Sequence, residues 1–202
     1  AIINWKIIES RNCEFDWGNS LFVMEEKTDT GDVIDFEPFV IRYRDDIRTA
    51  YQKVDETAVE MLRRTIFKVA SRTETLTKQD PNRATRYYKR APKDGIVDLN
   101  WDATKISDYV RALTHPYPGA FISLEFGNLK LWSVEVASCD TSFEPGTIVN
   151  IGFDGVLVKT GWFSAILLKR VGFMNQEYWA DELFKKLDLK NGDNLIARRK
   201  IV

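Results

Sequence analysis

Hydrophobic residues in the first part of the chain recur in patterns that predict one short helix followed by two extended segments. Ile3, Ile7 and Ile8 fall on one face of a helix within the first ten residues. The apolar run in residues 19–26 predicts a buried strand, and residues 33–41 predict a second extended segment that contains a proline. The pattern of this part therefore indicates a mixture of helix and strand.

A long helix is predicted to begin at Asp45 or Asp46, since aspartate is a preferred helix N-cap. Its apolar positions recur every three or four residues, which places them on one face and predicts that this face is core. These positions are Ile47, Tyr51, Val54, Ala58, Leu62, Ile66 and Val69. Residues 71–91 are polar and contain a proline, so they predict a linker.

The second half of the chain begins with a helical pattern in residues 100–113, which two prolines end. After it come five short strand-patterned runs separated by glycines, which favour a small antiparallel barrel or sandwich. The runs are residues 120–126, 128–137, 146–153, 155–161 and 163–173. A final helix is predicted over residues 175–187, followed by a turn at residues 191–192 and a last strand.

Composition indicates a globular protein without a strong overall charge. The 202 residues are 44% hydrophobic and 12% aromatic, which is enough to fill a core. Because 29 Lys and Arg nearly balance 30 Asp and Glu, any site for a polyanion must be local. No run approaches the roughly 20 apolar residues of a membrane span, and the first residues do not resemble a signal peptide. We therefore expect a cytoplasmic protein without a membrane partner.

Neither cysteine is assigned a role. Cys13 and Cys139 form no disulfide framework, which favours a reducing compartment. The sequence also has no cluster of Cys, His and carboxylates at metal-ligand spacing, so we expect no metal.

The segment KTDTGDVI, residues 27–34, places two carboxylates around a threonine and a glycine, directly after an apolar run. Asp and Gly are common turn formers, because Asp bonds to its own backbone and Gly adopts positive φ without strain. A plain turn explains this composition, and a catalytic carboxylate is the alternative.

Residues 71–91 are also basic, and their cations alternate with Tyr87 and Tyr88. Basic and aromatic side chains together can hold phosphates and stack on flat rings. A solvated linker would have the same composition, so the pattern alone leaves both interpretations open.

Several segments together resemble the folate-dependent formyltransferase family, which includes methionyl-tRNA formyltransferases and the formyltransferases of amino-sugar nucleotides. The resemblance is carried, in the order of the chain, by NWKIIE, TDTGDVI, QDPNRATRYYKRAPKDGIVDLNW, YVRALTHPYPGAF, PGTIVNIGFDGVLVKTG and LDLKNGDNL. It implies an α/β fold in which a partial Rossmann-like formyltransferase domain precedes a small β-barrel-like, OB-like domain. The implied division is residues 1–72 for the end of the catalytic domain, 73–91 for the linker and 92–202 for the β-rich domain.

The resemblance also implies a chemistry, with 10-formyltetrahydrofolate as cosubstrate and an Asn, a His and an Asp in the active site. The Asp maps onto Asp29 as the catalytic carboxylate, and Thr28, Gly31 and Asp32 of the same turn are implied to bind the folate. Gly31 is expected to let the backbone turn sharply, and Asp32 to hold the loop through backbone hydrogen bonds.

In the family, the Asn and His precede the NWKIIE segment. We therefore expect that the printed chain is a trimmed or incomplete piece of a longer protein and is inactive by itself. The single histidine, His115, is expected to be a solvent-facing residue at a helix end.

The implied acceptor is a primary amine. An amino-sugar nucleotide is favoured over methionyl-tRNA, because tRNA binding should require more net positive surface. Acceptor phosphates are expected at Arg83, Arg86, Lys89 and Arg90. A non-catalytic binding protein that kept the fold is a third possibility, and the sequence leaves the oligomeric state open.

Overall fold

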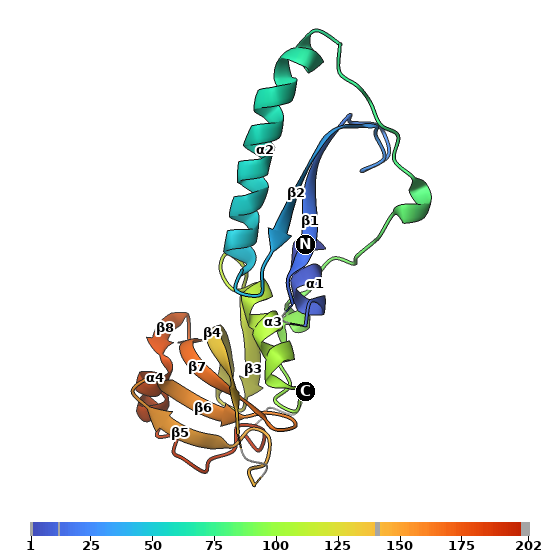
Figure 1. The fold of residues 1–202 in the computed structure, drawn as a ribbon. Helices are drawn as coiled ribbons and strands as arrows, with labels where there is room; N and C mark the ends of the chain where they lie inside the picture. Colours follow the sequence, from blue (N-terminus) through green and yellow to red (C-terminus); the bar gives the residue numbers. More distant parts are fainter. Residues whose placement is uncertain (1, 12, 140–141, 199–202) are drawn as a thin grey trace. The chain divides into compact units, whose positions relative to one another are not determined.

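The computed structural model describes residues 2–11, 13–139 and 142–198 (Figure 1). Its contacts divide the chain into two compact units, one formed by residues 13–88 and the other by residues 1–12 together with 89–202. We call these the hairpin unit and the sheet unit. They group the residues differently from the division expected at residues 72 and 91, because the first helix packs on a helix of the sheet unit.

The hairpin unit consists of two strands and one long helix. Strands β1 (Phe15–Phe22) and β2 (Val33–Ile41) pair antiparallel, from Phe15 opposite Ile41 to Phe22 opposite Val33. Helix α2 (Ile47–Ala70) lies along this pair (Figure 1). The expected extended segment at residues 33–41 is therefore confirmed.

Helix α2 begins at Asp46, whose carboxylate accepts hydrogen bonds from the N–H groups of Arg48 and Thr49 and so satisfies two otherwise unpaired donors. Further along the helix, the guanidinium of Arg64 bonds to the carboxylates of Asp35 and Glu37 on β2. The hydrogen bond from Arg64 lowers the pKa of Asp35, against a smaller opposing effect of burial. This ion pair is therefore intact at neutral pH and is lost only as the pH falls below the ordinary range of an aspartate.

Two details of the hairpin unit correct the predictions. Strand β1 begins at Phe15 and ends at Phe22, earlier than residues 19–26, and it is half-buried because only one face of a two-stranded sheet is covered. On α2, Met61 and Thr65 are buried, whereas Leu62, Ile66 and Val69 of the predicted core face are 38–53% exposed. The narrow hairpin covers a strip of the helix that is offset from the most apolar stripe.

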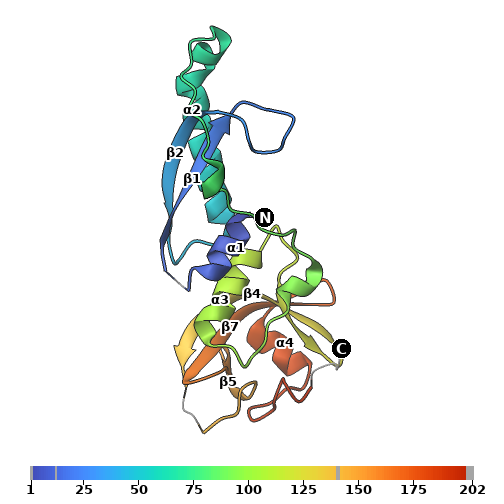
Figure 2. The same cartoon turned by 90° about the vertical axis from the view of Figure 1, so that its right-hand side faces the viewer.

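In the sheet unit, helix α1 (Ile2–Glu9) packs against α3 (Ala103–Leu113) (Figure 2). Ile3 and Ile7 are buried in this contact region, as the helical pattern predicts. Asn4 is also fully buried, and its side-chain Nδ2 donates a hydrogen bond of 2.6 Å to the carbonyl of Ala112. The first helix is thereby joined to a segment more than 100 residues later in the chain.

The remaining strands of the sheet unit form one six-stranded antiparallel sheet with the order β3-β4-β7-β6-β5, in which β8 pairs with β7. It is therefore one sheet and not the two of a sandwich. The strands are β3 (Ala120–Leu124), β4 (Gly127–Ser138), β5 (Ile148–Gly152), β6 (Gly155–Lys159), β7 (Ser164–Phe173) and β8 (Gln176–Trp179). Apolar residues of β3, β4 and β7 are buried, at alternate positions in β3, and α3 and α4 (Ala180–Lys186) contact the sheet. The mixed α/β class with a β-rich second part is confirmed.

The end of the chain differs from the prediction. Residues 176–179 are strand β8, so only the latter part of the helix predicted over 175–187 is helical. Met174 and Asn175, both at positive φ, form a tight turn that reverses β7 into β8. The predicted last strand is wrong for residues 193–198, which form one bridge at Asn194 and turns, and its final residues lie outside the described part of the chain.

The connecting segment contains two short 3-10 turns, Pro81–Arg83 in the hairpin unit and Pro92–Gly95 in the sheet unit. Within the described residues, no helix has the length and apolar character needed to cross a membrane. The same residues contain no group of three or more His, Cys, Asp or Glu side chains placed to hold a metal ion.

Lys159 at the end of β6 is 1% exposed, although lysine is rarely buried. Its ammonium donates to the carbonyls of Thr160 (2.9 Å), Trp162 and Ser164 (3.2 Å). These three bonds match the three donors of an ammonium, so the buried cation also fixes the loop between β6 and β7.

Replacing this lysine tests the role of its bonds. We expect Lys159→Met to lower the free energy of unfolding by about 2–4 kcal/mol, because three carbonyls lose their charged donor. The control is Lys169→Met, where the ammonium lies 3.8 Å from the largely exposed Glu135 carboxylate. That change should shift the free energy by less than about 1 kcal/mol. Urea denaturation of both variants measures the difference, and equal effects would contradict the role given to Lys159.

Candidate functional site

The turn between β1 and β2 brings Thr28, Asp29, Gly31 and Asp32 together, as the sequence predicts. Asp29 is exposed and has a φ of 60°, a left-handed conformation that Asp and Asn tolerate better than most residues. The side-chain amide of Gln79 donates to the carbonyls of Asp29 (3.2 Å) and Gly31 (2.6 Å). The turn is thus held from outside while the Asp29 carboxylate remains at the surface.

Gly31 is required for a reason other than the one expected. It is buried, and a Cβ atom there would lie 1.7 Å from the carbonyl oxygen of Val23, far inside any possible contact. The close approach is fixed by a hydrogen bond of 2.9 Å from the Val23 N–H to the carbonyl of Asp32. The sharp turn itself is made by Asp29, which has the positive φ, so the expectation that Gly31 makes it is corrected.

A second backbone contact closes the base of this turn. Val33 and Thr77 exchange two N–H to carbonyl hydrogen bonds of 2.8 Å each. The segment after α2 therefore returns along the turn, and Gln79, which holds the Asp29 backbone, follows directly from it. The Asp29 carboxylate itself belongs to an exposed residue of this turn.

The basic residues predicted to bind the acceptor lie on the segment after α2. Arg83, Arg86 and Lys89 are exposed. Arg90 differs, because its guanidinium lies over the Trp5 ring at 4.8 Å and donates a hydrogen bond of 2.7 Å to the carbonyl of Asp94. Arg90 therefore has a structural role in the sheet unit.

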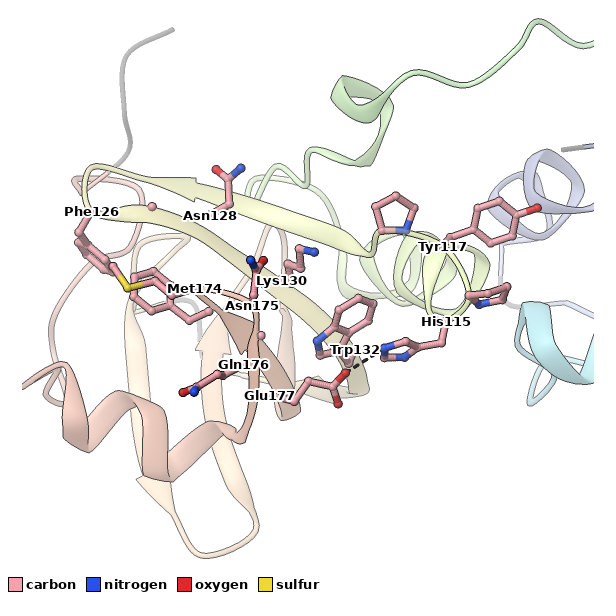
Figure 3. A pocket seen from close by; sticks show the side chains of 15 residues that line it. His115, Tyr117, Phe126, Asn128, Lys130, Trp132, Met174, Asn175, Gln176 and Glu177 are labelled. Atoms are coloured by element: carbon pink, nitrogen blue, oxygen red, sulfur yellow. Dashed lines mark ion pairs between the residues drawn. The ribbon is translucent and has the colours of Figure 1, made fainter.

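Three surface hollows are described. Two are in the hairpin unit, one around Asp55 and Arg63 and one around Arg64 and Glu74. The third lies in the sheet unit, has a volume of about 630 Å³ and is lined by residues of β4, the β7–β8 turn and residues 115–118 (Figure 3). Only this hollow combines aromatic and charged side chains from several elements.

His115 lines this hollow, which its position in the sequence did not indicate. Its imidazole is stacked on the Trp132 ring with centroids 4.0 Å apart, and its Nε2 lies 2.9 Å from the Glu177 carboxylate (Figure 3). The side chain is 46% exposed, so it does face solvent as expected, but it also belongs to a cluster. The sequence contains no local signal for it, because Trp132 and Glu177 come from distant strands.

Comparison with known families identifies the sheet unit. Residues 89–186 match the family described as "Formyl transferase, C-terminal domain". Residues 89–186 are therefore similar to a formyltransferase C-terminal domain, and the resemblance to the formyltransferase family is confirmed.

Solved structures support the same fold. The chain matches the crystal structure of a HypX variant from Aquifex aeolicus with a TM-score of 0.72, at 17% identity over 99% of this chain and 36% of that chain. WlaRD, a sugar 3N-formyl transferase in the presence of dTDP and 5-N-formyl-THF, matches with a TM-score of 0.56, at 17% identity over 86% and 60%. Methionyl-tRNA formyltransferase from Clostridium thermocellum matches with a TM-score of 0.51, at 20% identity over 65% and 55%. The chain therefore spans about a third of HypX and just over half of the other two.

The close packing at Gly31 makes a testable prediction about the turn. Gly31→Ala should displace the backbone at Val23 or Asp32, since carbonyl and Cβ cannot occupy the same space. Hydrogen–deuterium exchange at the Val23 and Val33 amides should become faster. The control Thr30→Ala removes only the 2.8 Å bond to the Lys27 carbonyl and should change exchange less. Unchanged exchange in Gly31→Ala would show that the turn is looser than the structure describes.

Proposed function

We propose that this chain works in a 10-formyltetrahydrofolate-dependent N-formyltransferase that transfers a formyl group to a primary amine. The observation that supports it most is the match of residues 89–186 to the formyltransferase C-terminal domain, together with the DTGD turn of residues 29–32 in the hairpin unit. HypX, one of the similar structures, has also been solved in complex with tetrahydrofolic acid.

The reaction is an acyl transfer. The amine nitrogen attacks the formyl carbon on N10, an oxyanion forms, the bond from carbon to N10 breaks, and the proton lost by the amine balances the proton gained by N10. Stabilising the oxyanion and moving that proton are the two tasks of the site.

Asp29 is proposed as the carboxylate that orients an imidazole and favours its protonated, positively charged form for these two tasks. The two hydrogen bonds from Gln79 fix the backbone of the turn, and the exposed Asp29 is open to a partner, which supports this role. The neighbouring Thr28, Gly31 and Asp32 are proposed to contact the folate. The hairpin unit contains no histidine, so the imidazole comes from elsewhere in the protein.

The amine is proposed to belong to an amino-sugar nucleotide. WlaRD is a sugar 3N-formyl transferase solved with dTDP, and this chain, with a formal net charge of −1, lacks the overall positive charge that favours tRNA binding. Methionyl-tRNA is the second candidate, because a methionyl-tRNA formyltransferase is among the similar folds. Arg83, Arg86 and Lys89 are proposed to contact the acceptor phosphates, with Arg90 supporting the segment.

The role of Asp29 is tested in the natural full-length protein. Asp29→Asn keeps the side-chain shape, and asparagine tolerates the left-handed backbone, so the fold should remain intact. The turnover number should fall by about a hundredfold or more, because the imidazole loses its oriented charge partner. Tetrahydrofolate release, measured with each candidate amine, gives the rate.

The control for this variant is Glu26→Gln, which neutralises another exposed carboxylate three residues earlier in the same loop. Its turnover should stay within about twofold of the wild type, an effect of at most about 0.4 kcal/mol. Near-normal turnover in Asp29→Asn would remove Asp29 from the mechanism.

The acceptor role is tested by charge reversal. We expect a rise in the acceptor KM for a variant that combines Arg83→Glu, Arg86→Glu and Lys89→Glu. Each change should contribute roughly a twofold to fivefold rise, because the residues are exposed, and folate binding should be unchanged. Lys190→Glu, at a 72% exposed lysine in the sheet unit, is the control. An unchanged acceptor KM would refute the binding role, and a strong salt dependence with tRNA as acceptor would favour methionyl-tRNA.

A further inference from the structure

The hollow in the sheet unit is large enough for a small molecule. Its volume of about 630 Å³ lies in the range of ligand sites, roughly 300–1,000 Å³. Figure 3 shows apolar side chains, Phe126 and Met174, at one end and His115 with Tyr117 at the other. Lys130 and Asn175 lie between these two ends in the same view.

The acidic group of the hollow is already paired. One Glu177 oxygen lies 2.9 Å from Nε2 of His115 and the other lies 3.6 Å from Nη2 of Arg170. The guanidinium of Arg170 in turn lies over the Trp179 ring at 4.7 Å. Glu177 is therefore held by two basic partners and does not neutralise the rest of the lining.

Lys130 is the cation that remains. Its ammonium forms no ion pair with a carboxylate of the described residues, and it lies over the Trp132 ring, 5.4 Å from the centroid. Asn128 and Asn175, which are exposed, line the same hollow and carry side-chain N–H groups that can donate to an anion. A half-buried cation with amide donors in the same lining favours a negatively charged group.

The apolar end favours a flat ring. Phe126 and Phe173 form an edge-to-face pair with centroids 5.9 Å apart, and the thioether of Met174, which is 78% exposed, lies beside them. Trp132 is not available for stacking, because His115 covers one face and the backbone at Gly119 and Gly172 approaches it closely. The Phe126 end is therefore the place for a ring.

We propose that this hollow is a binding site for a small ligand that joins a flat ring to an anionic group, with the anion at Lys130 and the ring against Phe126 and Met174. Two sources share this chemistry, a nucleotide and the aminobenzoyl-glutamate part of a folate. The proposal does not depend on the role of Asp29, which lies in the other unit, because binding here requires no formyl transfer.

The test measures binding to the full chain by isothermal titration calorimetry. The ring-and-anion probes are dTDP, AMP and p-aminobenzoylglutamate, and the partial probes are inorganic diphosphate, without a ring, and thymidine, without the anion. At least one of the first three should bind with a Kd below about 1 mM and at least about tenfold more tightly than both partial probes. A preference for nucleotides or for p-aminobenzoylglutamate assigns the source.

The variant Lys130→Met keeps the aliphatic stem and removes the charge. It should weaken the binding of the tightest ring-and-anion probe by about tenfold or more. The matched control is Lys105→Met, because Lys105 also lies over a tryptophan, with its ammonium 3.8 Å from the Trp101 ring centroid, but outside the hollow. The affinity of Lys105→Met for the same probe should stay within about twofold of the wild-type affinity. Circular dichroism and the unfolding midpoint confirm that both variants fold.

The proposal is overturned if none of the three probes binds with a Kd below about 1 mM, or if Lys130→Met and Lys105→Met have equal affinities. Diphosphate binding as tightly as the ring-bearing probes would overturn the ring contact at Phe126. In that case, Phe126→Leu would also leave every affinity unchanged, whereas the proposal expects it to weaken only the probes that carry a ring.

Discussion

The packing of α1 on α3 is the contact on which the organisation of the chain depends. Asn4 is fully buried and bonds to the carbonyl of Ala112, while Arg111 of the same helix bonds to Asp108 and to Ser10. Burying polar groups is unfavourable unless they are paired, so the bond from Nδ2 of Asn4 favours one alignment of the two helices, while Oδ1 of Asn4 is buried without a partner among the described residues. Because α1 packs with α3, the hairpin unit of residues 13–88 is inserted, along the sequence, between the two segments that form the sheet unit.

Elements with a strong local signal could be predicted from the sequence, and those that depend on distant partners could not. Helix α2 was predicted because its cap and its period are both local, and Asp46 does cap it. The buried strip of α2 was misplaced because the hairpin decides which residues are covered, so Met61 is buried and Leu62 is not. The predicted helix over residues 175–187 is wrong at β8, where Gln176 and Glu177 favour helix but Tyr178 and Trp179 favour strand, and the turn at Met174 and Asn175 sets a hairpin register.

The candidate site also contains residues with a local sequence signal and residues that depend on distant partners. The sequence predicted that Asp29 and Gly31 lie in one turn, but it could not predict which of them adopts positive φ and which one allows the close backbone contact. Positive φ is usually expected at glycine, whereas here Asp29 adopts it and Gly31 is needed for the approach to Val23. The cluster around His115 was missed for a physical reason: its stacking partner is 17 residues away on β4 and its carboxylate partner is on β8. Only the strand order of the sheet places those residues together.

Charge acts locally in this protein. Acidic and basic residues are nearly equal in number, but individual cations differ in whether their charge is paired within the protein. Lys159 is saturated by three carbonyls, Arg64 by two carboxylates and Arg90 by a carbonyl and a ring, so these cations hold structure. Lys130 has a ring beside it and amide side chains in the same hollow. A cation whose neighbours leave its charge uncompensated attracts an anion far more effectively than one already paired, and this separates Lys130 from the structural cations despite the net charge of −1.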